Sequence, residues 1–139
     1  EKKHNLDKLS SYKIFAKKVY KIRKDLVSLF KKIKSEGGKV IGYGASAKAV
    51  TVINFCNLKE KYFDYFFDTT DEKIGKLVPG TKITVKRYKK VKGRNKIYFF
   101  LGAWNFKDEI LKKENTFLKN NGKFITHLPT PKILRYSNK

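Results

Sequence analysis

The residues best suited to chemistry surround a glycine-rich turn, GYGASAK, at positions 42–48. Its glycines and Ala47 match the spacing G-x-G-x-x-A, in which glycine permits a tight turn and lets the backbone approach a phosphate. We expect the loop to bind a phosphate or a sugar hydroxyl, with Lys48 offsetting negative charge. A turn without a ligand is the alternative. The residues of the expected binding loop are Gly42, Tyr43, Gly44, Ala45 and Ser46.

Three charged residues further along the chain could complete such a site. Asp68 ends an apolar run and stands where a dinucleotide site places its ribose-binding carboxylate, although it could equally cap the turn that follows. Lys73 and Lys76 flank a glycine, and two flexible ammonium groups suit a diphosphate. Ordinary solvated loop charge is the alternative for both lysines.

A tryptophan and an asparagine follow another apolar run. The ring of Trp104 could stack against a base or a sugar, or pack at the rim of the core. Asn105 with Asp108 three residues later is typical of a helix cap, which we favour over ligand contact. Glu109 could pair with Lys48 across the strand ends.

The remaining reactive side chains predict no further site. Cys56 is the single cysteine and lies in an apolar run, so we expect a core residue and no disulfide. His4 and His127 are far apart and have no second ligand at metal spacing, so we expect surface or packing roles and no metal.

The elements that must position these residues alternate along the chain. Apolar residues at spacings of three and four indicate a long amphipathic helix over 11–35; they are Phe15, Val19, Ile22, Leu26, Leu29 and Ile33. Shorter helices are expected at 46–57 and 105–121. The expected strands are 39–44, 62–68, 82–85, 96–104 and 123–129. This alternation predicts an α/β fold, a Rossmann-like three-layer sandwich with a mostly parallel sheet, whose ligands bind at the carboxyl ends of the strands.

Charge and composition narrow the function. The 139 residues carry a net charge of +22, but all except four of the 34 basic residues are lysine and they are spread over the whole length. Nucleic-acid readers favour arginine, so we do not expect specific nucleic-acid binding. No run of about 18 apolar residues and no leader-like segment occurs, so we expect a cytoplasmic protein without a membrane partner. The chain begins without methionine and reads as a fragment.

Five blocks in order, namely GASAK, FFD with EKIGKLVPGTKI, AWNFKDEI and NGKFITHLPTP, resemble the C-terminal domain of sugar C-methyltransferases. The resemblance covers about residues 10–135. It implies an enzyme that methylates a nucleotide-linked keto-deoxysugar with S-adenosylmethionine. It also implies that zinc and S-adenosylmethionine are held by upstream domains, that this domain helps to bind the nucleotide sugar, and that no residue here is catalytic.

The resemblance implies two parts of this chain: residues 1–38, a helix that links to an upstream methyltransferase domain, and residues 39–139, the Rossmann-like domain. Ser46 stands where a proline is common in the family. Two other functions remain open. One is a freestanding nucleotide- or NAD-binding domain, which would use the same first loop. The other is a basic module that docks to an acidic partner.

Overall fold

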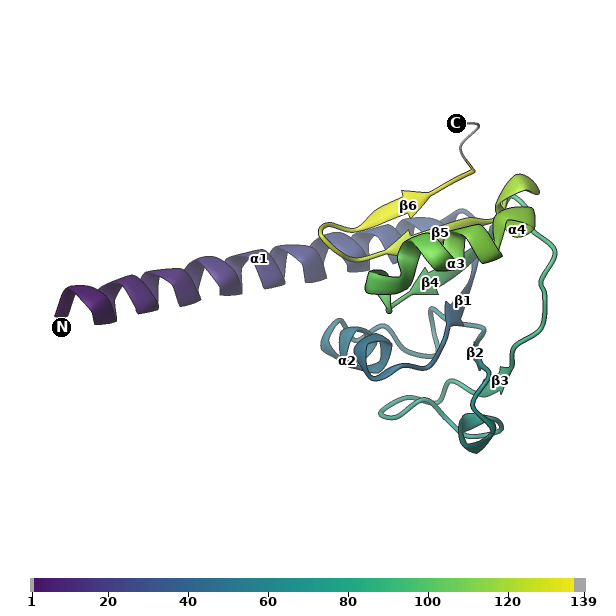
Figure 1. Ribbon diagram of the computed structural model, residues 1–139, viewed down its shortest axis with the longest axis horizontal. Coiled ribbons are helices and arrows are strands. Elements are labelled where there is room, and N and C mark those ends of the chain that lie inside the picture. The colour runs from purple at the N-terminus through teal and green to yellow at the C-terminus, as the bar shows by residue number, and fades with distance from the viewer. Residues whose placement is uncertain (1, 137–139) are drawn as a thin grey trace.

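The structure, a computed structural model, describes residues 2–136, with side chains from residue 8 onward. Helices and strands alternate as the sequence predicts (Figure 1). The helices are α1 (Lys2–Ser35), α2 (Ala47–Phe55), α3 (Lys107–Lys113) and α4 (Asn115–Lys119), with short 3-10 turns at Asp71–Lys73 and Trp104–Phe106. The strands are β1 (Lys39–Tyr43), β2 (Tyr65–Asp68), β3 (Val85–Arg87), β4 (Ile97–Leu101), β5 (Lys123–Thr126) and β6 (Lys132–Leu134).

The strands form one sheet in the order β3-β2-β1-β4-β5-β6. All neighbouring pairs are parallel except β5 and β6. This is the strand order of doubly wound dinucleotide-binding folds. The chain leaves β1 toward β2 on one side and leaves β4 toward β5 on the other. The expected fold class is therefore confirmed, and the order reverses between β1 and β4.

Two apolar layers cover the two faces of the sheet. Alternate strand residues point to opposite faces, so Val40 and Phe100 join the layer under α1 and α2, whereas Ile41 and Phe99 join the layer under α3 and α4. Cys56 is buried in the first layer, as predicted. The sheet, with helices packed on each of its two faces, forms the three-layer sandwich.

Helix α1 begins nine residues earlier than the sequence analysis placed it. Only its last turns reach the sheet, where Leu26, Phe30 and Ile33 are buried, and its amino-terminal half extends beyond the sheet (Figure 1). The predicted apolar face is therefore only partly a core face, since Phe15 is 65% exposed. Among the described residues, no helix has the length and apolarity that a membrane crossing requires.

Two other predicted elements differ from the structure, and one strand was not predicted. The third strand lies at Val85–Arg87, because residues 77–84 close a small hairpin through the bridge between Leu77 and Thr84. The helix predicted over 105–121 is divided at Glu114, whose φ of −97° and ψ of 27° interrupt it. The antiparallel strand β6 was not predicted, since its three residues are too short for a recognisable pattern.

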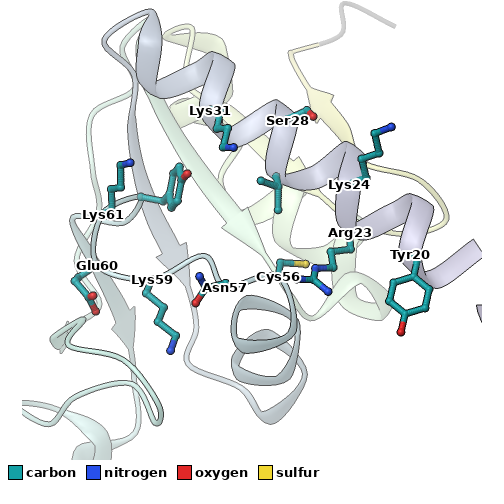
Figure 2. A pocket seen from close by; sticks show the side chains of 12 residues that line it. Tyr20, Arg23, Lys24, Ser28, Lys31, Cys56, Asn57, Lys59, Glu60 and Lys61 are labelled. Atoms are coloured by element: carbon teal, nitrogen blue, oxygen red, sulfur yellow. The ribbon is translucent and has the colours of Figure 1, made fainter.

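A groove of about 740 Å³ lies between α1 and the connection that follows α2 (Figure 2). Its walls are residues of α1 from Tyr20 to Lys31 and of the segment 56–62. None of the residues predicted to form a ligand site lines it.

Candidate functional site at the carboxyl edge of the sheet

The two positions of the first loop require glycine for different structural reasons. Gly42 lies inside β1, and a Cβ added there would meet ring carbons of Phe66 at 2.3 Å. Gly44 has a φ of +87° and open space around its missing side chain. The first glycine is thus required by packing within the sheet, and the second by the turn from β1 toward α2.

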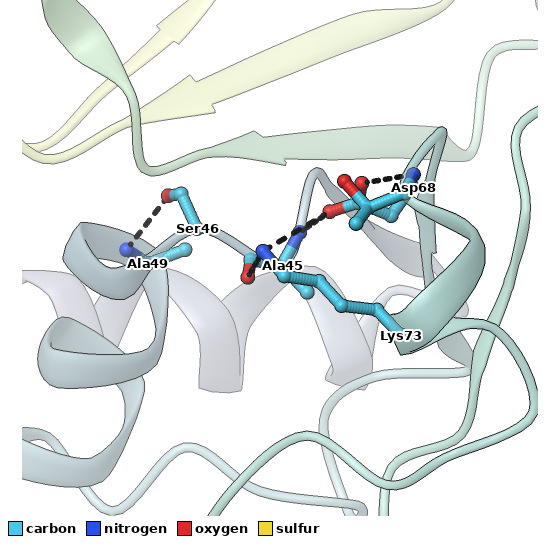
Figure 3. Close-up of polar contacts among 6 residues, drawn as sticks. Ala45, Ser46, Ala49, Asp68 and Lys73 are labelled. Atoms are coloured by element: carbon cyan, nitrogen blue, oxygen red, sulfur yellow. Dashed lines mark hydrogen bonds and ion pairs between the residues drawn. The ribbon is translucent and has the colours of Figure 1, made fainter.

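Asp68 holds this loop in place from the neighbouring strand (Figure 3). Its Oδ2 accepts the backbone N–H of Ala45 at 2.9 Å, and its Oδ1 accepts the backbone N–H of Thr70 at the same distance. Lys73 Nζ donates to the Ala45 carbonyl at 2.9 Å and lies 3.8 Å from Asp68 Oδ2. Two roles were predicted for Asp68. The structure shows that it caps the turn that follows β2. Its contact with a ribose stays a prediction.

The same contacts set the charge state of Asp68. Burial alone would raise the pKa of this carboxyl, but the hydrogen bonds from Thr70 and Ala45 and the nearby Lys73 ammonium together hold the pKa below its usual value. Asp68 therefore remains a carboxylate through the neutral range. Because the Ala45 N–H is already donated to it, a ligand at the loop would find that amide engaged.

Ser46 caps α2. Its Oγ accepts the backbone N–H of Ala49 at 3.2 Å (Figure 3). The predicted cap is confirmed. The first amides of a helix have no partner inside the helix, and α2 begins at Ala47, shortly after β1 ends at the carboxyl edge of the sheet. The start of α2 therefore offers donors to a negatively charged group.

Lys48 and Asn105 connect the two sides of the point where the strand order reverses. Lys48 Nζ donates to Asn105 Oδ1 at 3.2 Å, joining the connection after β1 to the connection after β4. The predicted pair of Lys48 with Glu109 is wrong, since Glu109 forms no ion pair within residues 8–136. The predicted cap by Asn105 is wrong as well, because residues 104–106 form a 3-10 turn and α3 begins after Phe106 without a side-chain cap.

A cavity of about 590 Å³ adjoins the loop. Ala45 and Val50 line it from the loop and α2, and Lys73, Lys76 and Leu77 line it from the segment after β2. Its surface is mostly apolar, and its charged lining residues are the two lysines and the carboxylate Glu72. The structure thus brings Ala45, Lys73 and Lys76 together. Lys48, Asn105 and Trp104, which is 44% exposed, are not among its lining residues.

Sequence reasoning missed a buried carboxylate beside the loop. Glu114 is 4% exposed, and its Oε2 accepts the hydroxyl protons of Tyr43 at 2.7 Å and Tyr88 at 2.6 Å. Burial first, and then Glu114, raises the pKa of Tyr88 to about 12, and the pKa of Tyr43 is raised for the same reasons. The sequence does contain a pattern that indicates burial of Glu114. This residue stands four residues after Ile110 and three before Phe117, on the apolar face of the predicted helix.

The tyrosines also border a second, smaller cavity. It encloses about 200 Å³, and Tyr43, Gly44, Asp68, Tyr88 and Lys113 are among its lining residues. Gly44 and Asp68 line this smaller cavity, whereas the neighbouring Ala45 lines the larger one. The glycine loop therefore contributes residues to both cavities.

Within the part of the chain that the structure describes, no group of three or more His, Cys, Asp and Glu side chains is placed to hold an ion. The His127 ring is buried near Phe100, burial lowers the pKa of the imidazole, and its Nδ1 has no hydrogen-bond partner among the described residues. Its predicted packing role is confirmed. The side chain of His4 lies outside the described residues.

Two comparisons with known proteins identify the family of this chain. The family model of the C-methyltransferase C-terminal domain matches residues 1–129. The C-methyltransferase NovU of Streptomyces niveus is 32% identical over 123 residues, which cover 88% of this chain and 29% of the relative. The chain therefore spans less than a third of the length of that protein.

Proposed function

The chain belongs to the C-methyltransferase C-terminal domain family, and from this we propose that it binds the nucleotide-linked keto-deoxysugar substrate of an S-adenosylmethionine-dependent C-methyltransferase. The observation that carries the proposal is the cavity of about 590 Å³ at the carboxyl edge, which is largely apolar and has Lys73 and Lys76 in its wall. An apolar hollow beside two cations suits a base or sugar joined to a diphosphate.

The cavity lining has two cations against one carboxylate, Glu72, and so keeps a net positive charge that suits such a ligand. Lys76 forms no ion pair among the described residues, so its ammonium is available to a phosphate. Lys73 is shared with Asp68 and the Ala45 carbonyl, and so both holds the loop and faces the cavity. The amides at the start of α2 add donors, and Lys48 adds a charge next to them.

The position of Asp68 supports a proposal about which part of the enzyme binds the cofactor. Both carboxylate oxygens of Asp68 accept backbone N–H groups, and the side chain is only 11% exposed, so it is not presented to the ribose of S-adenosylmethionine. We propose that upstream domains hold this cofactor and the zinc, and that no residue of this chain takes part in methyl transfer.

Amide NMR of the labelled chain tests the proposal. Nucleoside diphosphate sugars with thymine, uracil, guanine and cytosine bases would be titrated to millimolar concentration beside S-adenosylmethionine and NAD. We expect saturable shifts at residues 44–48 and 73–76 with at least one nucleotide sugar and no shifts with S-adenosylmethionine. Shifts with S-adenosylmethionine, shifts with NAD alone, or none with any nucleotide sugar would each overturn the proposal. The NAD outcome would favour the freestanding cofactor-binding function.

A lysine series separates charge at the site from the general excess of lysine. Lys48→Gln and Lys76→Gln should each weaken nucleotide-sugar binding by about two- to fivefold at low salt, and by less at high salt. Lys89→Gln, an exposed lysine outside the cavity, is the matched control. Because a cation in the first turn of a helix is disfavoured by the dipole, Lys48→Gln should keep or slightly raise thermal stability. Equal weakening by all three variants would assign binding to net charge.

A further inference from the structure

The groove along α1 carries an inference that is independent of the proposed sugar site. It encloses about 740 Å³ and is lined by α1 and by the segment 56–62, whose residues do not belong to the carboxyl-edge site. The residues of the two walls lie between 25 and 42 positions apart in the sequence, and folding brings them together.

The walls of the groove are cationic. Arg23, Lys24 and Lys31 stand on α1, and Lys59 and Lys61 stand on the opposite segment (Figure 2). None of these five forms an ion pair among the residues that the structure describes. Glu60 is the one carboxylate in the lining; its Oε1 accepts the backbone N–H of Lys82 at 2.8 Å, and the group keeps its negative charge. The lining therefore holds five cations against one carboxylate, an excess of positive charge that the protein itself does not neutralise.

The floor of the groove is apolar. Val27, Cys56 and Tyr62 contribute to the lining between the charged side chains, and Cys56 is only 5% exposed. At one end, the Tyr20 ring is 61% exposed and lies 6.3 Å from the ring of Phe55. Arg23 reaches from α1 toward Cys56 and lies 5.3 Å from the Phe55 ring centre (Figure 2). A ligand in this groove meets an apolar strip between two rows of cations.

We propose that the groove binds an acidic, amphipathic segment of a partner protein. Carboxylates of the segment pair with cations of both walls, while an aromatic or aliphatic side chain covers the apolar floor. A free oligophosphate would leave the floor uncovered, and a nucleic-acid groove would favour arginine, whereas four of these five cations are lysine. The stretch from Tyr20 to Lys31 rises about 17 Å along the helix, the length of about five extended residues.

Fluorescence anisotropy with a labelled peptide tests this proposal. The probe is a peptide of about eight residues in which glutamates surround two phenylalanines. Its controls are the same peptide with serine in place of phenylalanine, and an oligothymidylate of equal charge. We expect saturable binding of the phenylalanine peptide at low salt, with the serine peptide about tenfold weaker because burial of the aromatic rings is lost.

A matched pair of double variants locates the binding. Lys31→Glu with Lys61→Glu reverses one charge on each wall, whereas Lys89→Glu with Lys112→Glu makes the same change in net charge at exposed positions outside the groove. All four lysines are exposed, and circular dichroism would verify the fold of each variant. We expect the groove variant to bind the peptide about tenfold or more weakly, and the control to change by less than about twofold.

Three results would overturn the proposal: no saturable binding, equal weakening by both double variants, or binding of the oligothymidylate or the serine peptide as tight as that of the phenylalanine peptide. The last would show that the groove recognises charge alone. Nucleotide-sugar binding should be the same in both double variants, because neither lies at the carboxyl-edge cavity. Failure of one proposal is thus distinguishable from failure of the other.

Discussion

The carboxylate of Asp68 accepts the backbone N–H of Ala45 over 2.9 Å and so ties the end of β2 to the glycine loop that follows β1. Lys73 closes the arrangement by donating to the carbonyl of Ala45 from the next turn of the chain. The loop is therefore held at both its amide and its carbonyl by residues more than 20 positions away. Its shape is fixed without a ligand, which favours binding because less ordering is needed when one arrives.

We predict that Asp68→Asn destabilises the fold in a pH-dependent way. An asparagine loses one of the two accepted backbone N–H groups and the Lys73 contact, so unfolding at pH 7 should be easier by about 1–3 kcal/mol. The folded pKa of Asp68 lies below its unfolded value of about 3.9. The stabilisation is therefore present above that pH and is lost as the pH falls through the folded pKa.

Urea unfolding at pH 7 and near pH 3 would measure this difference. The gap between Asp68→Asn and the unaltered chain should narrow at the lower pH. The exposed Asp64→Asn is the control, with an expected effect within about 0.5 kcal/mol. A gap of the same size at both pH values would contradict a role for the ionised carboxylate.

The two loop glycines should respond differently to alanine. Gly42→Ala places a Cβ where the Phe66 ring lies, so strand or ring must move, and a loss of about 1–3 kcal/mol or more is expected. Gly44→Ala meets no atom within 4 Å and adds only the strain of a positive φ, about 1 kcal/mol. Chemical denaturation of both variants compares them directly. A larger loss for Gly44→Ala would mean that the loop, rather than the sheet packing, limits stability.

Glu114 should control the ionisation of Tyr88. Burial and the hydrogen bond to Glu114 raise the pKa of Tyr88 to about 12, above its unfolded value of about 10. The stabilisation from the protonated tyrosine is thus fully present below pH 10 and is lost as the pH rises through the folded pKa. Glu114→Gln removes the charge but keeps most of the burial, so the pKa of Tyr88 should fall below 12 and stay above 10.

Ultraviolet titration of tyrosinate, taken as the difference between each chain and its Tyr88→Phe counterpart, isolates Tyr88 from the other seven tyrosines. Glu109→Gln, an exposed carboxylate on α3, is the matched control and should leave the titration unchanged. An unchanged pKa in Glu114→Gln would assign the shift to burial alone.

The local sequence pattern was sufficient to predict part of the fold of this molecule. Apart from β6 and the division of the last helix, the order of helices and strands was predicted, as were the mostly parallel sheet and the Ser46 cap, because apolar spacing and cap residues depend on neighbours within a few positions. The location of the loop at the carboxyl edge followed from that order. The sequence by itself therefore determined the fold class and the edge of the sheet at which a ligand site could lie.

Tertiary structure decided the partners of the polar side chains. Asp68 is joined to Ala45, and Lys48 to Asn105 rather than Glu109. Glu114 is joined to two tyrosines, one at the end of β1 and one just after β3. Each of these contacts depends on which remote segments meet and at what register. The cationic groove arises in the same way, because α1 and the segment 56–62 contribute its two walls. A one-dimensional pattern carries no information on such distances, and only the packing of the layers brings these groups together.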